Sequence, residues 1–291
     1  MSDFVLFTDS CCDIPQSILD EWNVRCIQLS FCYDHQAVEY RNCDVTADEF
    51  YKKLQEYGFA KTSAINAYTY ETTFEEVLKE GRDLMYIGFS SGLSSSSVTA
   101  QSVAADLKEK YPERKIKAID SLCGCGGQGL LVYLADEKRR AGASIDETAE
   151  YVLSMRQHID HWFTLDTLTY LRRGGRISAS AAVLANVLDI HPMIHVDETG
   201  RLVNTAKIRT RARSVKTLLD RYMEHAKDPE KGKFIICQGA CREDALKLDD
   251  MIFEKCGNRA MHITDIGPVM GTHGGPGNLA IFFITEGRNQ P

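Results

Sequence analysis

Short apolar runs and amphipathic stretches alternate along the first half of the chain. The apolar runs are 4–7, 84–89 and 116–119, each followed by small hydroxyl residues, and helical patterns follow at 98–110 and 127–140. Asp13 and Pro15 suit the cap and the first turn of a helix after the first run. This alternation predicts a parallel sheet with ligand-facing loops at the carboxyl ends of its strands. The sequence therefore predicts an α/β fold whose N-terminal domain has three α/β/α layers and a mainly parallel sheet.

The second half has a different order of elements. Apolar stretches at 193–196 and 202–206 flank the polar sequence Asp197–Gly200, as in a β-hairpin. The pattern then predicts a helix at 211–225, a strand at 234–237, a helix at 243–255, and strands near Met261 and Ile281. We therefore expect a C-terminal α/β domain with a mixed sheet. The boundary is placed near residues 158–164, which gives domains of residues 1–160 and 161–291.

Capping boxes mark the starts of two further helices. Thr46 pairs with Glu49, and Ser144 pairs with Glu147, each at the spacing in which a hydroxyl and a carboxylate satisfy two free backbone N–H groups. The second of these helices is expected to end at the domain boundary.

The composition is that of a soluble globular protein. The 291 residues are 44% hydrophobic and 26% charged. The longest apolar stretches, such as Leu130–Ala135, fall far short of the roughly 20 residues that a membrane helix needs. The start of the chain, Met1 to Phe4, lacks the cationic and apolar regions of a secretory signal. We therefore expect a cytoplasmic protein with no integral membrane segment.

Ten cysteines in such a chain are expected to be reduced, small structural residues. Cys11 and Cys12 are adjacent, and Cys123 and Cys125 are separated by one residue. Neither pair has the spacing of a zinc site. The sequence therefore predicts no metal site and no cofactor.

Positive charge is concentrated in one segment. The whole chain has a net charge of −7, but residues 171–217 contain nine positive and three negative side chains, a net charge of +6, so the remainder carries −13. A basic segment in an acidic protein is typical of an anion-binding face. Nucleic acid is not an expected partner, because the whole protein would repel phosphate backbones and no recognition motif accompanies the segment.

The sequence Gly88–Gly92 matches the G-x-S-x-G nucleophile elbow of serine hydrolases, with Ser90 as the nucleophile. Asp265 and His273 follow in the order that such enzymes use. No oxyanion motif of the HGGG type precedes Ser90, and small residues are also expected wherever backbone amides crowd around a ligand. A hydrolase that uses Ser90 is therefore the alternative hypothesis.

A second short motif, Gly124–Gly129, matches the dinucleotide-binding pattern G-x-G-x-x-G. The match stands alone, without a partnering acid near the end of a following strand. Close helix packing against a glycine-rich turn is the favoured interpretation.

Three segments carry hydrogen-bond donors suited to an anion. They are Lys61-Thr62-Ser63, Ser90-Ser91-Gly92-Leu93-Ser94, and a rigid glycine-lined turn at Gly267–Gly277 that contains His273 and Gly274. Hydroxyls and free N–H groups at a helix start favour negative charge. His273 and Arg209 are expected to supply positive charge or further donors. The set suits a carboxylate better than proton abstraction, because it offers donors but no buried acid–base pair.

At these residues the chain resembles the DegV family, the fatty-acid-binding subunits of the bacterial fatty acid kinase system. The shared motifs run from end to end: Thr8-Asp9-Ser10 with Asp13-Ile14-Pro15, Lys61-Thr62-Ser63, Ser90-Ser91-Gly92-Leu93-Ser94, Asp120-Ser121, Asp166-Thr167-Leu168 with Tyr170-Leu171, Arg173-Gly174-Gly175-Arg176-Ile177, Lys207 with Arg209-Thr210-Arg211, and Gly267-Pro268-Val269 with Gly271-Thr272-His273 and Gly275-Pro276-Gly277. Their order and spacing make the set specific.

The resemblance implies a carrier and not an enzyme. A two-domain protein would enclose one long-chain fatty acid with its carboxylate at the domain interface, and a separate ATP-dependent kinase subunit would phosphorylate it. The ligand-binding residues expected are Thr62, Ser63, Ser91, Ser94, Arg209, His273 and Gly274. Docking to the kinase is assigned to Arg172, Arg173, Arg176, Arg209 and Arg211. A sensor or protein-interaction module that uses the same basic face without a lipid is a third class.

Overall fold

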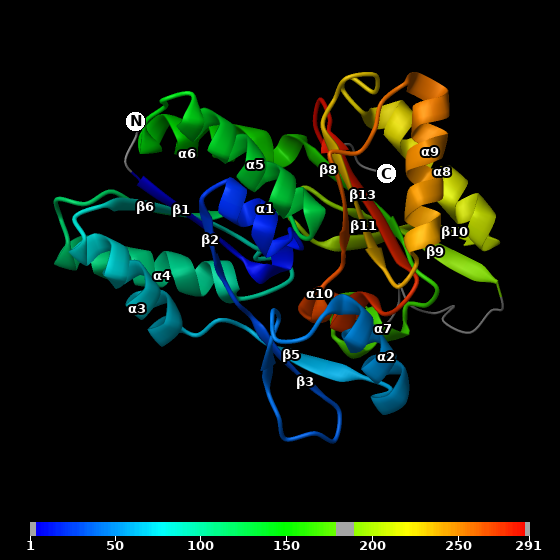
Figure 1. Ribbon diagram of the computed structural model, residues 1–291, viewed down its shortest axis with the longest axis horizontal. Helices are drawn as coiled ribbons and strands as arrows, with labels where there is room; N and C mark the ends of the chain where they lie inside the picture. The colour runs from blue at the N-terminus through cyan, green and yellow to red at the C-terminus, as the bar shows by residue number, and fades with distance from the viewer. Residues whose placement is uncertain (1–3, 179–188, 289–291) are drawn as a thin grey trace.

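The computed structural model describes residues 4–178 and 189–288 (Figure 1). Met1–Asp3, part of the segment for which the sequence predicts no secretory signal, lie outside this range. The described chain forms a four-stranded sheet of order β2-β1-β6-β7, a six-stranded sheet of order β10-β9-β8-β13-β11-β12, and a three-stranded sheet of order β4-β3-β5. Among the described residues, no helix combines the length and the apolar character needed to span a bilayer.

The four-stranded sheet is entirely parallel and is covered on both faces. Its elements are β1 (Phe4–Asp9), a 3-10 turn (Ser10–Cys12), α1 (Gln16–Glu21), β2 (Val24–Ile27), α3 (Ala67–Lys79), β6 (Asp83–Gly88), α4 (Ser96–Lys110), β7 (Ile116–Asp120), α5 (Gly126–Arg140) and α6 (Ile145–Met155). Phe4 and Leu6 pack under α1, α5 and α6, whereas Val5 and Phe7 pack against α3 and α4. Because side chains alternate along a strand, both faces of β1 are apolar. The predicted α/β/α layers are confirmed.

The six-stranded sheet is mixed, as predicted. Its elements are β8 (Ile159–Thr164), β9 (Ile190–Val196), β10 (Leu202–Arg209), α8 (Arg211–His225), β11 (Phe234–Gly239), α9 (Arg242–Cys256), β12 (His262–Asp265) and β13 (Asn278–Ile284), with a 3-10 turn at Arg156–His158. Only β11 and β12 pair in parallel among these described strands. Helices α8 and α9 cover the outer face (Figure 1). The inner face turns toward α5. The boundary at residues 160 and 161 stays a prediction.

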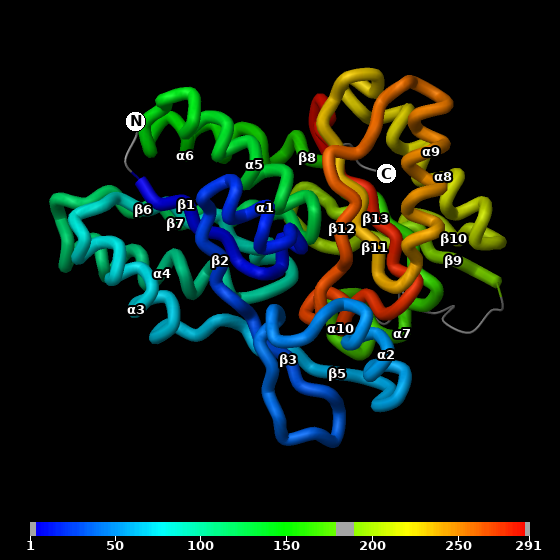
Figure 2. The backbone as a smooth tube through the Cα atoms, in the orientation of Figure 1, coloured from blue at the N-terminus to red at the C-terminus, as the bar shows by residue number. Residues whose placement is uncertain are grey.

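The three-stranded sheet was not predicted. Strands β3 (Ser30–Tyr33), β4 (Tyr40–Arg41) and β5 (Ala60–Ser63) are antiparallel, and α2 (Ala47–Tyr57) lies between β4 and β5 in sequence. The backbone trace in Figure 2 places this unit beside α7 (Thr169–Arg173) and α10 (Pro268–Gly274). Segments from both halves of the chain therefore meet around β5.

Local signals in the sequence set several element boundaries. The helix predicted at 211–225 is α8, and the hairpin of β9 and β10 is present. Both capping boxes form: Thr46 caps α2 and Ser144 caps α6. All ten cysteines, each within the described range, are free thiols.

Two local predictions are wrong. Asp13 does not cap the first helix, because Pro15 occupies the cap position of α1, and the Asp13 carboxylate instead accepts a hydrogen bond from the Gly267 N–H at 2.9 Å. The glycine-rich segment Gly267–Gly277 is not a turn throughout, because Pro268 begins the short helix α10. Proline is tolerated in the first turn of a helix, where its missing N–H has no partner to lose.

The glycines of Gly124–Gly129 let α5 pack between the two larger sheets, as the packing interpretation predicted. A β-carbon on Gly127 would lie 2.2 Å from His161 Nε2, and one on Gly126 would lie 2.7 Å from Cys237 Sγ. On the other side, a β-carbon on Gly129 would lie 2.5 Å from an Ile14 side-chain carbon. These positions have no room for a side chain, so glycine is required for α5 to approach the six-stranded sheet on one side and the segment between β1 and α1 on the other.

Candidate functional site

A cavity lies where the carboxyl ends of the parallel strands face the inner surface of the six-stranded sheet. It holds about 950 Å³ of space, including its opening to solvent, which is within the range of small-molecule sites. Its wall on the sheet side includes alternate residues of β13, namely Asn278, Ala280 and Phe282, together with residues of β8, β9 and β10. Phe89 and Cys125 line the opposite side. The greater part of the cavity wall is therefore apolar.

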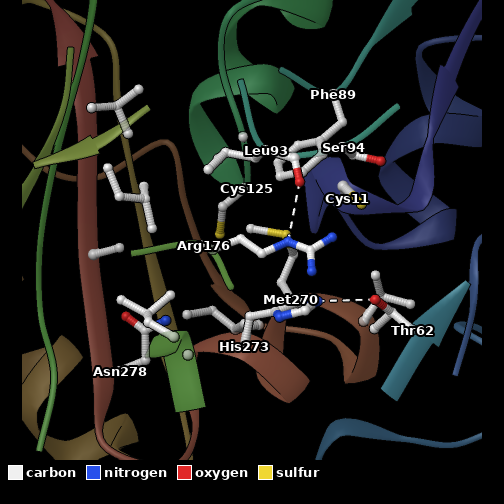
Figure 3. Close-up of a pocket in the computed structure, with 18 of the residues that line it drawn as sticks. Cys11, Thr62, Phe89, Leu93, Ser94, Cys125, Arg176, Met270, His273 and Asn278 are labelled. Carbon is white, nitrogen blue, oxygen red and sulfur yellow. Dashed lines mark hydrogen bonds between the residues drawn. The ribbon is translucent and has the colours of Figure 1, made fainter. Parts of the chain in front are cut away.

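Polar side chains gather at one end of this cavity (Figure 3). Thr62 on β5 and His273 on α10 are joined by a contact of 2.9 Å between Oγ1 and Nε2. Arg176, which follows α7, donates from Nε to the Leu93 carbonyl at 3.1 Å. Ser94 lies in the loop before α4 and lines the cavity, and its Oγ accepts a hydrogen bond from the Ser96 N–H at 3.2 Å and lies 3.1 Å from Ser96 Oγ. Hydroxyl, imidazole and guanidinium groups from four distant segments thus surround one small volume.

Burial decides the charge of these groups. The pKa of His273 falls from 6.5 to about 4, first because the ring is buried and second because the Arg176 guanidinium is positive. His273 is therefore neutral at pH 7, so of the two roles expected for it, positive charge or a further donor, the pKa favours the donor. Burial also lowers the pKa of Arg176 from its usual value, but a guanidinium stays protonated in proteins. Arg176 is the cation of this end of the cavity.

The structure brings together four of the seven predicted ligand-binding residues: Thr62, Ser94, His273 and Gly274 line the cavity. The other three do not. Ser63 and Ser91 are exposed, and Arg209 is an exposed residue at the end of β10.

The arginines assigned to docking separate into three groups. Arg172, Arg173 and Arg209 are exposed. Arg211 is partly buried, with its Nε 2.8 Å from Asp244 Oδ2. Arg176 points into the cavity, so its assignment to docking missed a site residue.

The sequence contains one signal for the inward position of Arg176, the glycine pair Gly174-Gly175 that separates it from Arg173. In the structure, a β-carbon on Gly174 would lie 2.2 Å from His273 Nδ1. Gly175 has a φ of +72°, a left-handed conformation that favours glycine. The glycine pair therefore allows the end of α7 to approach α10 and turn Arg176 inward.

The geometry does not support a hydrolase that uses Ser90. The Ser90 hydroxyl is buried and donates to the Gly200 carbonyl at 2.8 Å, while it accepts a hydrogen bond from the Gly92 N–H at 3.1 Å. His273 bonds to Thr62 instead. A serine nucleophile needs a base within hydrogen-bond reach, and the hydrogen bonds recorded for Ser90 in the described chain include none to a histidine.

A titration of His273 tests whether its ring is neutral at pH 7. We expect its ring to titrate near pH 4 when followed by the NMR shifts of the labelled imidazole, and Arg176→Ala to raise that pKa because a nearby positive charge is removed. The folded pKa lies below the ordinary value, so His273 contributes stability above about pH 6.5 that is lost as the pH falls toward 4. A titration midpoint near 6.5 in the wild-type protein would contradict the assignment.

Comparisons with known proteins agree with this architecture. Residues 3–286 match the family model described as "Uncharacterised protein, DegV family". A DegV domain-containing protein from Clostridium perfringens is 37% identical over 287 residues, which cover 98% of this chain and 99% of that protein. Among solved structures, DegV from Bacillus subtilis, a fatty acid binding protein, is 24% identical with a TM-score of 0.84, covering 98% of this chain and 100% of that one. A stearic acid-binding protein from Eubacterium ventriosum is 22% identical with a TM-score of 0.87, covering 97% and 98%. The chain belongs to the DegV family.

Proposed function

We propose that this protein binds one long-chain fatty acid, with its acyl chain in the cavity and its carboxylate at Thr62, Ser94 and Arg176. The observation that carries the proposal is an apolar cavity lined at one end by the half-buried cation Arg176 and by Thr62 and Ser94. If the His273 ring carries its proton on Nε2, it donates to Thr62 Oγ1 and leaves the threonine O–H free to donate to the carboxylate. Thr62 Oγ1 would then accept from His273 and donate to the bound carboxylate.

The energetics favour an enclosed acyl chain. Burial of a sixteen-carbon chain contributes about 0.8 kcal/mol per methylene, or roughly 10 kcal/mol before the costs of association. An unpaired carboxylate in the same interior would cost several kcal/mol, so the donors at the polar end are needed. The fatty-acid-binding proteins of the same fold from Bacillus subtilis and Eubacterium ventriosum support this ligand class.

Native mass spectrometry of freshly purified protein tests the proposal. We expect an added mass equal to one fatty acid, which disappears when the protein is denatured. Delipidated protein is then titrated with palmitate, because a bound fatty acid can be lost during purification. If the purified protein carries no added mass and the delipidated protein does not bind palmitate, the proposal is wrong.

The second part of the proposal is a carrier role. A separate ATP-dependent kinase subunit would phosphorylate the bound fatty acid: a carboxylate oxygen bonds to the γ-phosphorus of ATP, ADP leaves, and the acyl phosphate stays on the carrier. Such a pair would act in the cytoplasm, where ATP is available. The exposed cations Arg172, Arg173 and Arg209 support docking to an acidic surface. The family resemblance supports the kinase as that partner.

Arg209→Ala tests the docking role. We expect palmitate affinity within about twofold of wild type, because Arg209 is exposed and does not line the cavity, and phosphorylation by a fatty acid kinase subunit about tenfold slower, because a rim charge mainly affects association. Lys207→Ala, an exposed cation on the same strand, is the matched control. Phosphorylation at the wild-type rate in Arg209→Ala would show that Arg209 has no docking role.

A further inference from the structure

One polar side chain interrupts the apolar wall that β13 gives to the cavity. The residues of β13 that line the cavity are Asn278, Ala280 and Phe282, and the last two are apolar. Asn278 is 8% exposed, so more than nine-tenths of the residue is buried. Its Oδ1 atom is buried and has no hydrogen-bond partner among the described residues. A carboxamide in this position destabilises the folded protein, because it loses its hydration and gains no bond in return.

Local structure does not account for this amide. Asparagine side chains commonly bond to nearby backbone groups in turns, and Asn278 directly follows a turn. In the described chain, the contacts of Asn278 with strand and turn are instead made by its backbone. It pairs with Gly239 of β11, and its carbonyl accepts a hydrogen bond from Cys241 Sγ at 3.3 Å. The side chain therefore serves neither the sheet nor the turn.

The amide lies close to the polar end of the cavity. A β-carbon on Gly274 would lie 2.3 Å from Asn278 Nδ2, so the amide packs against the end of α10. The residue before Gly274 is His273, which contacts Thr62. Figure 3 shows His273 between Thr62 and Asn278, with Asn278 on the side of the six-stranded sheet. Asn278 is therefore a neighbour of the groups that surround the proposed carboxylate position.

We propose that Asn278 makes the cavity selective for a long-chain fatty acid with a hydroxyl group on one of its first carbons, at position 2 or 3. This inference rests on the proposed function, which puts the carboxylate at Thr62 and Arg176. A hydroxyl both donates and accepts hydrogen bonds, so it pairs with either end of the carboxamide. A keto group only accepts and would leave Oδ1 without a donor. An unsubstituted acyl chain offers the amide no partner at all.

Calorimetric titration of delipidated protein with palmitate, 2-hydroxypalmitate and 3-hydroxypalmitate tests this selectivity. We expect wild-type protein to bind one of the two hydroxy acids about fivefold more tightly than palmitate, the factor typical of one neutral hydrogen bond. Asn278→Leu replaces the amide by an apolar group of similar size. This variant is expected to bind palmitate at least as tightly as wild type and to prefer palmitate over both hydroxy acids. A merely structural role of Asn278 would weaken all three ligands and leave their ratios unchanged.

Two controls make the result specific. The hydroxyl of 16-hydroxypalmitate is at the far end of the chain, so Asn278→Leu is not expected to change its affinity relative to palmitate. Met270→Leu alters another residue of the cavity wall with little change in volume and is expected to keep the wild-type ratios. Asn278→Ala takes the place of Asn278→Leu if thermal unfolding shows that the larger apolar side chain disturbs the fold.

The outcomes separate this inference from the proposed function. If wild-type protein binds palmitate as tightly as both hydroxy acids, or if the variants at Asn278 keep the wild-type ratios, Asn278 does not select the ligand and the fatty acid proposal stands. If wild-type protein binds none of these acids, the proposed function itself fails. A preference for a hydroxy acid that is lost only in the variants at Asn278 supports the inference.

Discussion

Arg176→Ala is expected to lower the affinity for palmitate about thirtyfold, the largest loss for any single side chain of the cavity. A hydrogen bond to a charged group contributes about 2 kcal/mol, which corresponds to that factor. Arg176 is the cation that lines the cavity among the described residues, and His273 is neutral at pH 7. Without Arg176, the carboxylate keeps only hydroxyl donors. Calorimetric titration of delipidated protein with palmitate measures the effect.

Two variants make this result specific. Arg172→Ala removes an exposed positive charge nearby and is expected to leave palmitate affinity unchanged. Ser94→Ala removes a neutral donor, so its expected loss is about fivefold, near 1 kcal/mol, with the fold intact. Wild-type affinity in Arg176→Ala would show that the carboxylate lies elsewhere.

Gly127→Val is expected to lower the free energy of unfolding by about 3 kcal/mol, the largest stability effect that the structure indicates. The added β-carbon would lie 2.2 Å from His161 Nε2. The imidazole cannot easily move away, because its Nδ1 lies 3.0 Å from the Ile159 carbonyl and the ring packs edge-on against Phe282. Overpacking of this kind typically costs about 1–3 kcal/mol, and a branched side chain at a helix start is expected at the upper end. Urea denaturation measures the change.

The matched control is Gly287→Val. A β-carbon at Gly287 meets nothing within 4 Å, and this glycine does not have a positive φ, so the same substitution is expected to change stability by less than about 0.5 kcal/mol. Equal stability of the Gly127→Val and wild-type proteins would mean that α5 does not pack tightly between the sheets. That result would contradict the role assigned to the glycine motif.

The amino-acid sequence by itself determined the elements whose signals are local. Apolar runs followed by amphipathic stretches predicted the parallel sheet, and the capping boxes at Thr46 and Ser144 predicted the starts of α2 and α6. These features depend on residues three or four positions apart, or on alternation along one strand, so no knowledge of distant segments is needed. The glycine motif at Gly124–Gly129 likewise predicted close packing, although not its partners.

Only the tertiary structure decided which groups share the polar end of the cavity and what charge they have. Thr62 and His273 are 211 positions apart in the chain, and their contact depends on how β5 and α10 pack. Arg172 and Arg176 are both arginines of one basic segment, and the sequence does not distinguish them. In the structure, Arg176 lines the cavity and Arg172 is exposed. The neutral state of His273 follows from burial and from the field of Arg176. Burial is a property of the whole fold, so the pKa of a site residue is set by segments that the local sequence does not contain.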